Sequence, residues 1–200
     1  MQTITDIKDL EALYGAAMPH SLSKVRTRLT PLYRQWIETA RFVVLTSVGP
    51  EGTDASPRGE DGPVVRIVDD RTVQLPDWMG NNRIDTLRNI VRDGRLSLMF
   101  MVAGSNNVVR INGTAVLTAD EAVLESYDKN GRRPRSVAVI TVDEVYFQCA
   151  KALLRSGLWT RDHDGHRVPT AGQFVQEEDE GFDGAAFDAG YAEYAKERMW

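Results

Sequence analysis

The residues best suited to chemistry lie in a short turn near the middle of the chain. Gly80, Asn81, Asn82 and Arg83 stand between an apolar segment and a periodic, helix-like one. Glycine permits a tight turn, an asparagine can cap a helix, and the free N–H groups at a helix start favour negative charge. With Arg83 expected in the first helical turn, the segment predicts an anion site, and a phosphate suits it best.

A second candidate segment, residues 54–62, combines a hydroxyl, a guanidinium and two glycines. Serine, proline, glycine and aspartate are common in turns, so one interpretation is a charged loop that joins two strands. The alternative is a ligand loop in which Ser56 and Arg58 face a cofactor.

A third candidate segment begins at Lys151. Lys151 and Arg155 are spaced i,i+4, so on a helix they share a face, where like charges repel mildly unless an anion or a carboxylate lies between them. Trp159 can either stack on a planar ring or pack in the core. His163 and His166 have no third ligand in view, and we expect no metal site.

The composition narrows the class of protein. The chain has 200 residues, 42% of them hydrophobic, as in an ordinary soluble globular protein. Its net charge of −5 gives no global attraction to nucleic acid or to an anionic membrane, so any anion must be bound locally. The single cysteine, Cys149, excludes an internal disulfide, and no apolar run approaches the roughly 20 residues that span a bilayer. We therefore expect a cytoplasmic protein with no nucleic-acid or membrane partner.

Strands are the main elements that must position these segments. Stretches rich in β-branched residues and bounded by turn residues cover residues 41–48, 63–68, 72–75, 96–102, 108–117 and 137–149. Only one helix falls among the first four of them. This pattern favours a mainly β fold with flanking helices (α+β), an antiparallel sheet that closes into a six-stranded barrel, over a doubly wound sheet.

Helical spacing is expected in four places outside the C-terminal tail: residues 4–14, residues 31–40 after a Thr-Pro start, the segment that begins at Arg83, and residues 120–130. In the helix from Arg83, apolar residues at 84, 87, 90 and 91 predict a buried stripe. We expect one domain over residues 1–175. Residues 176–200 then form an acidic linker and a C-terminal helix that packs on the body or on a dimer partner.

Several segments together resemble the pyridoxamine 5′-phosphate oxidase-like flavoproteins, in order from about residue 42 to residue 159. They are ASPRGEDG (55–62), VVRIVDDRTVQLPD (64–77), GNNRIDTLRNIVRDGRLSLMF (80–100), VVRINGTAVLT (108–118) and QCAKALLRSGLW (148–159). The likeness is strongest to the branch with an SPRGD-type loop and a GNNR-type turn. Glu60 stands where that branch has aspartate, which keeps the charge on a longer side chain.

The resemblance implies an FMN-binding split β-barrel with FMN at the interface of a homodimer. By position, Ser56, Pro57 and Arg58 belong to the strand end and loop that meet the flavin ring and ribityl chain. Asn82 and Arg83 match the phosphate-binding turn, with Leu87 on the helix packed behind it.

The same resemblance assigns the third segment to the neighbouring subunit. The residues expected to reach FMN from there are Lys151, Arg155, Ser156 and Trp159. The oxidase's C-terminal Arg-x-His element has no counterpart here, because Ser156 and Gly157 follow Arg155. The substrate therefore stays open.

The function expected from this family is that of an FMN-dependent oxidoreductase, in which the flavin takes electrons from a small-molecule substrate or from a reduced nicotinamide donor. No side chain is required as a general base, and Arg58 is our candidate for stabilising reduced flavin or steering an anionic substrate. Three alternatives remain. They are a flavin-binding protein without turnover that serves storage, stress sensing or partner interaction, the same barrel with a deazaflavin or haem, and a plain interaction domain.

Overall fold

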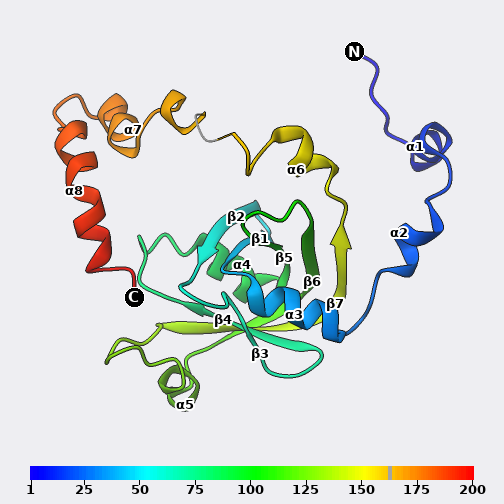
Figure 1. The fold of residues 1–200 in the computed structure, drawn as a ribbon, viewed down its shortest axis with the longest axis horizontal. Coiled ribbons are helices and arrows are strands. Elements are labelled where there is room, and N and C mark those ends of the chain that lie inside the picture. Colours follow the sequence, from blue (N-terminus) through cyan, green and yellow to red (C-terminus); the bar gives the residue numbers. More distant parts are fainter. Residues whose placement is uncertain (162–163) are drawn as a thin grey trace.

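The fold is a mainly antiparallel β-sheet with helices around it (Figure 1), seen in a computed structural model that describes residues 1–161 and 164–200. The strands are β1 (Phe42–Gly49), β2 (Gly52–Gly59), β3 (Arg66–Ile67), β4 (Thr72–Asp77), β5 (Arg95–Met101), β6 (Val108–Thr118) and β7 (Ser136–Gln148). The helices are α1 (Ile7–Tyr14), α2 (Pro19–Ser23), α3 (Pro31–Thr39), α4 (Asp85–Arg92), α5 (Glu121–Glu125), α6 (Lys151–Ser156), α7 (Ala171–Glu178) and α8 (Gly184–Lys196), with a 3₁₀ turn at Asp164–Arg167.

One sheet contains every strand, in the order β2-β1-β5-β6-β7-β4-β3. All of its neighbouring pairs are antiparallel. The predicted class, mainly β with flanking helices, is confirmed. The predicted strand count and closure are wrong, because the sheet has seven strands and its two end strands do not pair with each other.

The additional strand is β2, which lies in the segment interpreted from composition as a loop. Its residues pair one by one with β1, for example Val44 with Pro57 and Leu45 with Ser56. Proline is tolerated there because β2 is an edge strand, where one N–H group is not needed for the ladder. Pairing with β1 therefore determines the conformation of β2, although the residues of β2 by themselves favour a turn.

The core of the sheet follows from the alternation along its strands. Burial in β1 and β5 alternates residue by residue, so Val43 and Leu45 on β1 and Leu98 and Phe100 on β5 are fully or almost fully buried. Ile37 of α3 is also fully buried in this core. Within the part of the chain that the structure describes, no helix is both long and apolar enough to cross a membrane.

Helix α4 buries only part of the predicted stripe: Ile90 is buried and Leu87 packs against the core, but Ile84 is exposed. Its buried residues are Thr86, Asn89 and Ile90, whereas Val91 is 73% exposed. Asn89 Nδ2 donates a hydrogen bond of 3.1 Å to Oγ of Ser47, a buried residue of β1. The helix therefore packs on the sheet through polar partners as well as through Ile90 and Leu87, and apolar periodicity alone could not show the polar contacts.

Helices α1 and α3 fall within their expected ranges, but α5 is shorter than predicted. It ends at Glu125, because the chain then forms a turn in which Lys129 and Arg132 pair across Asn130 and Gly131. These two turn residues have φ values of 56° and 83°, outside the helical region.

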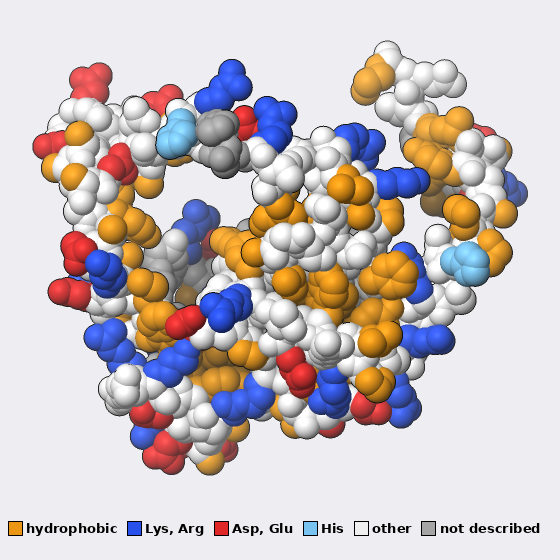
Figure 2. Space-filling model, viewed as in Figure 1, with side chains coloured by type: hydrophobic (Ala, Val, Ile, Leu, Met, Phe, Trp, Pro, Cys, Tyr) orange, Lys and Arg blue, Asp and Glu red, His pale blue; other side chains and the backbone are white. Residues whose placement is uncertain are grey.

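The C-terminal arm, residues 151–161 and 164–200, leaves the end of β7, contacts the body at Trp159 and meets it again at its tip (Figure 1). An opening separates much of the arm from the body in the space-filling view (Figure 2). Within the arm, α7 and α8 approach closely at Gly172 and Gly184, where a side chain on either residue would overlap the other backbone. Because α7 extends to Glu178, the first residues of the expected acidic linker are helical. The boundary between the domain and the tail stays a prediction.

Candidate functional site

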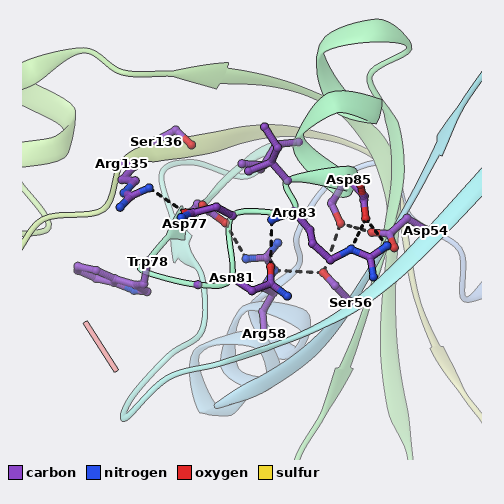
Figure 3. Close-up of a pocket in the computed structure, with 15 residues that line it drawn as sticks. Asp54, Ser56, Arg58, Asp77, Trp78, Asn81, Arg83, Asp85, Arg135 and Ser136 are labelled. Carbon is purple, nitrogen blue, oxygen red and sulfur yellow. Dashed lines mark hydrogen bonds and ion pairs between the residues drawn. The ribbon is translucent and has the colours of Figure 1, made fainter. Parts of the chain in front are cut away.

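A cavity of about 380 Å³ lies between β2, the end of β4, the start of β7 and the turn before α4 (Figure 3). That volume is in the range of small-molecule sites. The cavity brings together five of the residues that the resemblance assigns to FMN binding, namely Ser56, Arg58, Asn82, Arg83 and Leu87. Its other lining residues are Asp54, Asp77, Trp78, Gly80, Asn81, Ile84, Asp85, Thr86, Arg135 and Ser136.

Strand β2 supplies one wall of the cavity. Side chains alternate along a strand, so Asp54, Ser56 and Arg58 share the face that lines the cavity, and each is partly buried. Pro57 points to the other face and lines a separate cavity of about 270 Å³. The predicted ligand loop is therefore a strand, with Pro57 turned away from the other two.

Arg58 is held in place at the centre of the cavity. Its Nη1 donates to Asp77 Oδ1 at 2.6 Å, and its Nε donates to Ser56 Oγ at 3.2 Å. The Arg58 and Asp77 side chains are only 26% and 19% exposed. The guanidinium is thus fixed in direction, and its charge is matched by a carboxylate.

The turn before α4 supplies the opposite wall, with a geometry that differs from the prediction. Gly80 does not adopt a left-handed conformation, whereas Asn82 and Ile84 do, with φ values of 60° and 52°. Ile84 is the N-cap residue and α4 begins at Asp85, so Arg83 precedes the helix and neither asparagine caps it. The Asn81 side chain instead accepts a hydrogen bond of 3.1 Å from the Arg83 backbone N–H.

The start of α4 is tied to β2 by hydroxyl groups. The Thr86 hydroxyl donates to Asp54 Oδ2 and lies 3.4 Å from Ser56 Oγ. This link fixes the turn over the strand. An isoleucine in the left-handed region is an unfavourable conformation for a β-branched residue, and such conformations persist where the surrounding structure holds them.

Arg83 is the exposed cation of the turn. Its Nε and Nη2 lie 3.0 and 2.9 Å from Asp85 Oδ2, and its side chain is 78% exposed. Exposed ion pairs contribute little free energy, whereas guanidinium groups bind phosphate through two parallel hydrogen bonds. Arg83 can therefore exchange Asp85 for an anion at small cost.

Several functional residues of the cavity were missed by sequence reasoning. Asp54 and Asp77 provide the carboxylates that hold Thr86 and Arg58. Arg135, just before β7, donates from Nη1 to Asn82 Oδ1 at 2.8 Å. Asp54 and Asp77 lie at the ends of segments selected from the sequence but were assigned no role, whereas Arg135 lies outside every selected segment.

The third predicted segment does not line this cavity. Lys151, Arg155 and Ser156 lie on α6 and are exposed. Trp159 is 37% exposed and donates from Nε1 to the Ser105 carbonyl at 2.6 Å, so it is not a core residue. It lines a separate, mostly apolar cavity of about 760 Å³.

No metal site is evident in the described residues, among which no group of three or more metal-ligating side chains occurs. His163 lies outside the described residues, so the predicted lack of a metal site at His163 and His166 is not tested.

The flank of the cavity is formed by Trp78 and a buried carboxylate. Trp78 Nε1 donates to Glu60 Oε2 at 3.0 Å, and Lys129 Nζ lies 2.6 Å from Glu60 Oε1. Trp200 Nε1, from the tip of the C-terminal arm, donates to the same oxygen at 3.0 Å. Glu60, which replaces the aspartate of the SPRGD-type loop, thus joins the arm to the edge of the site.

Comparison with known proteins gives a family match. Residues 29–149 match the sequence model of a family described as Pyridoxamine 5′-phosphate oxidase, over more than half of the chain. No match was found among curated protein sequences.

Solved structures with a similar fold include HupZ of Group A Streptococcus, with 21% identity over 58% of this chain and 91% of that one, and a TM-score of 0.48. General stress protein 26 of Bacillus anthracis has 13% identity over 57% and 88% of the two chains, with a TM-score of 0.42. An FMN-binding protein of Syntrophomonas wolfei has 9% identity over 72% and 97%, with a TM-score of 0.45. At these TM-scores, none of these likenesses bears on the activity of this chain.

Proposed function

The chain belongs to the pyridoxamine 5′-phosphate oxidase family, and on that premise we propose that it binds FMN in the cavity between β2 and the turn before α4 and acts as a flavin-dependent oxidoreductase. One observation carries the proposal. Two motifs far apart in the sequence, Ser56–Arg58 and Asn82–Arg83, contribute to opposite walls of a single cavity.

The donor groups of the cavity fit a phosphate. A phosphate ester carries nearly two negative charges and needs cations and N–H donors around it. Arg83 is exposed and weakly paired with Asp85. Asn82, the preceding residue, lines the same wall of the cavity. These two residues would hold the phosphate, while Leu87, which is partly buried on α4, supports the turn from behind.

The other wall would orient the ring of the cofactor. When bound, FMN supplies the electron transfer, since its ring can accept and release hydride. Ser56 and Arg58 would provide hydrogen-bond donors beside the ring. Because Asp77 fixes its direction, Arg58 is suited to stabilising negative charge there or to steering an anionic substrate.

A homodimer with FMN at the subunit interface completes the proposal. Lys151, Arg155, Ser156 and Trp159 are exposed and do not line the cavity of their own chain, which agrees with a role at the neighbouring subunit's site. The electron donor would be a small-molecule substrate or a reduced nicotinamide. A cytoplasmic location is part of the proposal, because the single cysteine, Cys149, is a free and exposed thiol.

The direct test is Arg83→Ala, with FMN affinity measured by flavin fluorescence. We expect the Kd for FMN to rise by roughly tenfold to a hundredfold, the loss typical of a charge-assisted hydrogen-bond donor. Arg88→Ala is the matched control, because Arg88 is also an exposed arginine near the start of α4 but does not line the cavity. A colourless protein that takes up no added FMN would refute the proposal.

Two further measurements separate the alternatives. The visible spectrum of the purified protein distinguishes oxidised flavin from deazaflavin and from haem, because each absorbs differently. Stopped-flow mixing with reduced nicotinamides then tests turnover. A flavin that stays oxidised with every donor would indicate a flavin-binding protein without activity of its own. If Arg83→Ala leaves all ligand binding unchanged, an interaction domain is favoured.

A further inference from the structure

The charged side chains of the cavity are not all paired with one another. The lining contains three guanidinium groups, of Arg58, Arg83 and Arg135, and three carboxylates, of Asp54, Asp77 and Asp85. Arg58 is paired with Asp77, and Arg83 is paired with Asp85. Within the residues that the structure describes, no carboxylate lies within ion-pair distance of Arg135. Asp54 accepts a hydrogen bond from the Thr86 hydroxyl instead, so among the described residues Arg135 is the arginine of the lining that has no carboxylate partner.

The groups beside Arg135 are hydrogen-bond donors. Its Nη1 donates to Asn82 Oδ1, at 2.8 Å, and this is its only side-chain hydrogen bond to the described residues. The remaining guanidinium N–H groups and the Asn82 amide NH₂ group are available to a ligand. A guanidinium group without a carboxylate partner, beside a further N–H donor, selects an anion with several oxygen atoms, such as a phosphate or a carboxylate.

The backbone holds Arg135 in position. Pro134, which is buried, restricts the chain before it, and the Arg135 backbone N–H donates to the Asp77 carbonyl at 3.1 Å. The next residue, Ser136, pairs with Asp77 in the β4–β7 ladder. The backbone of Arg135 is thus tied to the sheet directly before β7, and its side chain reaches Asn82 in the turn before α4.

We propose that Arg135 and Asn82 form an anion-binding subsite at the β7 side of the cavity, which takes the phosphate or carboxylate group of a bound ligand. The inference rests on the proposed function, because the FMN phosphate is one source of that anion. An anionic substrate is the other source. Arg135 lies outside the motifs of the sequence resemblance and is an additional ligand-binding residue.

The test compares FMN with riboflavin, which has the same ring and no phosphate. The variants are Arg135→Ala, Arg135→Lys and the control Arg88→Ala. If the anion is the FMN phosphate, Arg135→Ala raises the Kd for FMN by about tenfold or more and leaves the Kd for riboflavin unchanged. Arg135→Lys retains part of the affinity, because it keeps the charge but loses the planar fork.

A second arm tests the substrate as the source of the anion. Inorganic phosphate is titrated into FMN-loaded protein and followed by flavin fluorescence. Loss of phosphate binding in Arg135→Ala, with FMN affinity intact, assigns the subsite to an anionic substrate. Equal loss of FMN and riboflavin, or no change in any of these measurements, overturns the inference.

The failure of this inference is separable from failure of the proposed function. If the wild-type protein binds neither flavin, the proposed function fails. Calorimetric titration of inorganic phosphate into the flavin-free protein still decides the subsite. The subsite is supported if Arg135→Ala abolishes phosphate binding and Arg88→Ala retains it. The subsite is refuted if phosphate binding does not depend on Arg135.

Discussion

Glu60 gathers four hydrogen-bond donors on one carboxylate. They come from the Asp61 backbone, Lys129, Trp78 and Trp200, at 2.6 to 3.0 Å. The Lys129 ammonium also lies 5.0 and 4.8 Å from the ring centres of Trp78 and Trp200, a favourable cation–π arrangement. Burial raises the pKa of Glu60, but the bonds from Lys129, the Asp61 backbone and Trp200 outweigh it and hold this pKa below its ordinary value of 4.5.

The lowered pKa sets the sign of a pH effect. A carboxyl group with a depressed folded-state pKa contributes stability above its unfolded pKa, here 4.5, and loses it as the pH falls through the folded value. We expect Glu60→Gln to lower the free energy of unfolding at neutral pH by roughly 1–3 kcal/mol, because charged donors lose their acceptor. The difference from wild type should shrink below pH 4.5. Urea unfolding over that pH range measures both quantities.

The control for this prediction is Glu51→Gln. Glu51 pairs with Arg92 on the surface and is 79% exposed. Its replacement should change the free energy of unfolding by roughly 0–1 kcal/mol. A Glu60→Gln effect that stays constant into acid would contradict the assigned pKa shift.

Helix α4 is positioned by its contact with the end of β1. A side chain at Gly49 would overlap Oδ1 of Asn89, a buried residue that also bonds Ser47. The glycine is therefore needed for the close approach of helix and strand. This approach places the turn at Asn82 over β2, since Thr86 then reaches Asp54.

We expect Gly49→Ala to lower the free energy of unfolding by roughly 1–3 kcal/mol, as overpacking of a well-packed contact does. It should also weaken FMN binding, because the turn before α4 shifts with the helix. Gly80→Ala is the matched control for stability, since a Cβ there meets no atom within 4 Å. Its effect should stay within roughly 0.5 kcal/mol. Thermal unfolding and flavin titration measure the two effects, and equal free energies of unfolding for the two variants would show that the contact at Gly49 is unimportant.

At the scale of the whole molecule, the chain has two separate groups of proposed FMN residues. One group lines the cavity, whereas the other, on and after α6, is exposed elsewhere. A symmetric homodimer can bring the α6 group of one subunit to the cavity of the other. A site shared between two subunits predicts a result that a site built from one chain does not.

We expect Arg83→Ala and Arg155→Ala to complement each other in a mixed dimer. Each variant alone should bind FMN weakly, while a heterodimer purified by two different tags should regain about one FMN per dimer, because one interface then keeps both arginines. Absorbance at saturation gives the stoichiometry, and light scattering gives the subunit number. A heterodimer as weak as its parents, or an Arg155→Ala homodimer with full affinity, would contradict the shared site.

The sequence by itself determined the fold class, most strand positions, the family resemblance and two walls of the site. These features depend on local signals, namely the alternation of apolar residues and short motifs such as SPRGE and GNNR. Helix α4 was also predicted, although its start was placed two residues early, at Arg83 instead of Asp85. Capping patterns indicate a helix start only to within a few residues.

Only the tertiary structure decided which residues complete the site. The β2 strand forms because β1 pairs with it, Arg58 is fixed by Asp77 from β4, and Arg135 reaches Asn82 across 53 positions of the chain. Likewise, Trp200 meets Glu60 across 140 positions. Long-range pairing leaves no periodic or local pattern in one sequence, so the acidic partners and the unmatched arginine became visible only when the sheet had brought them together.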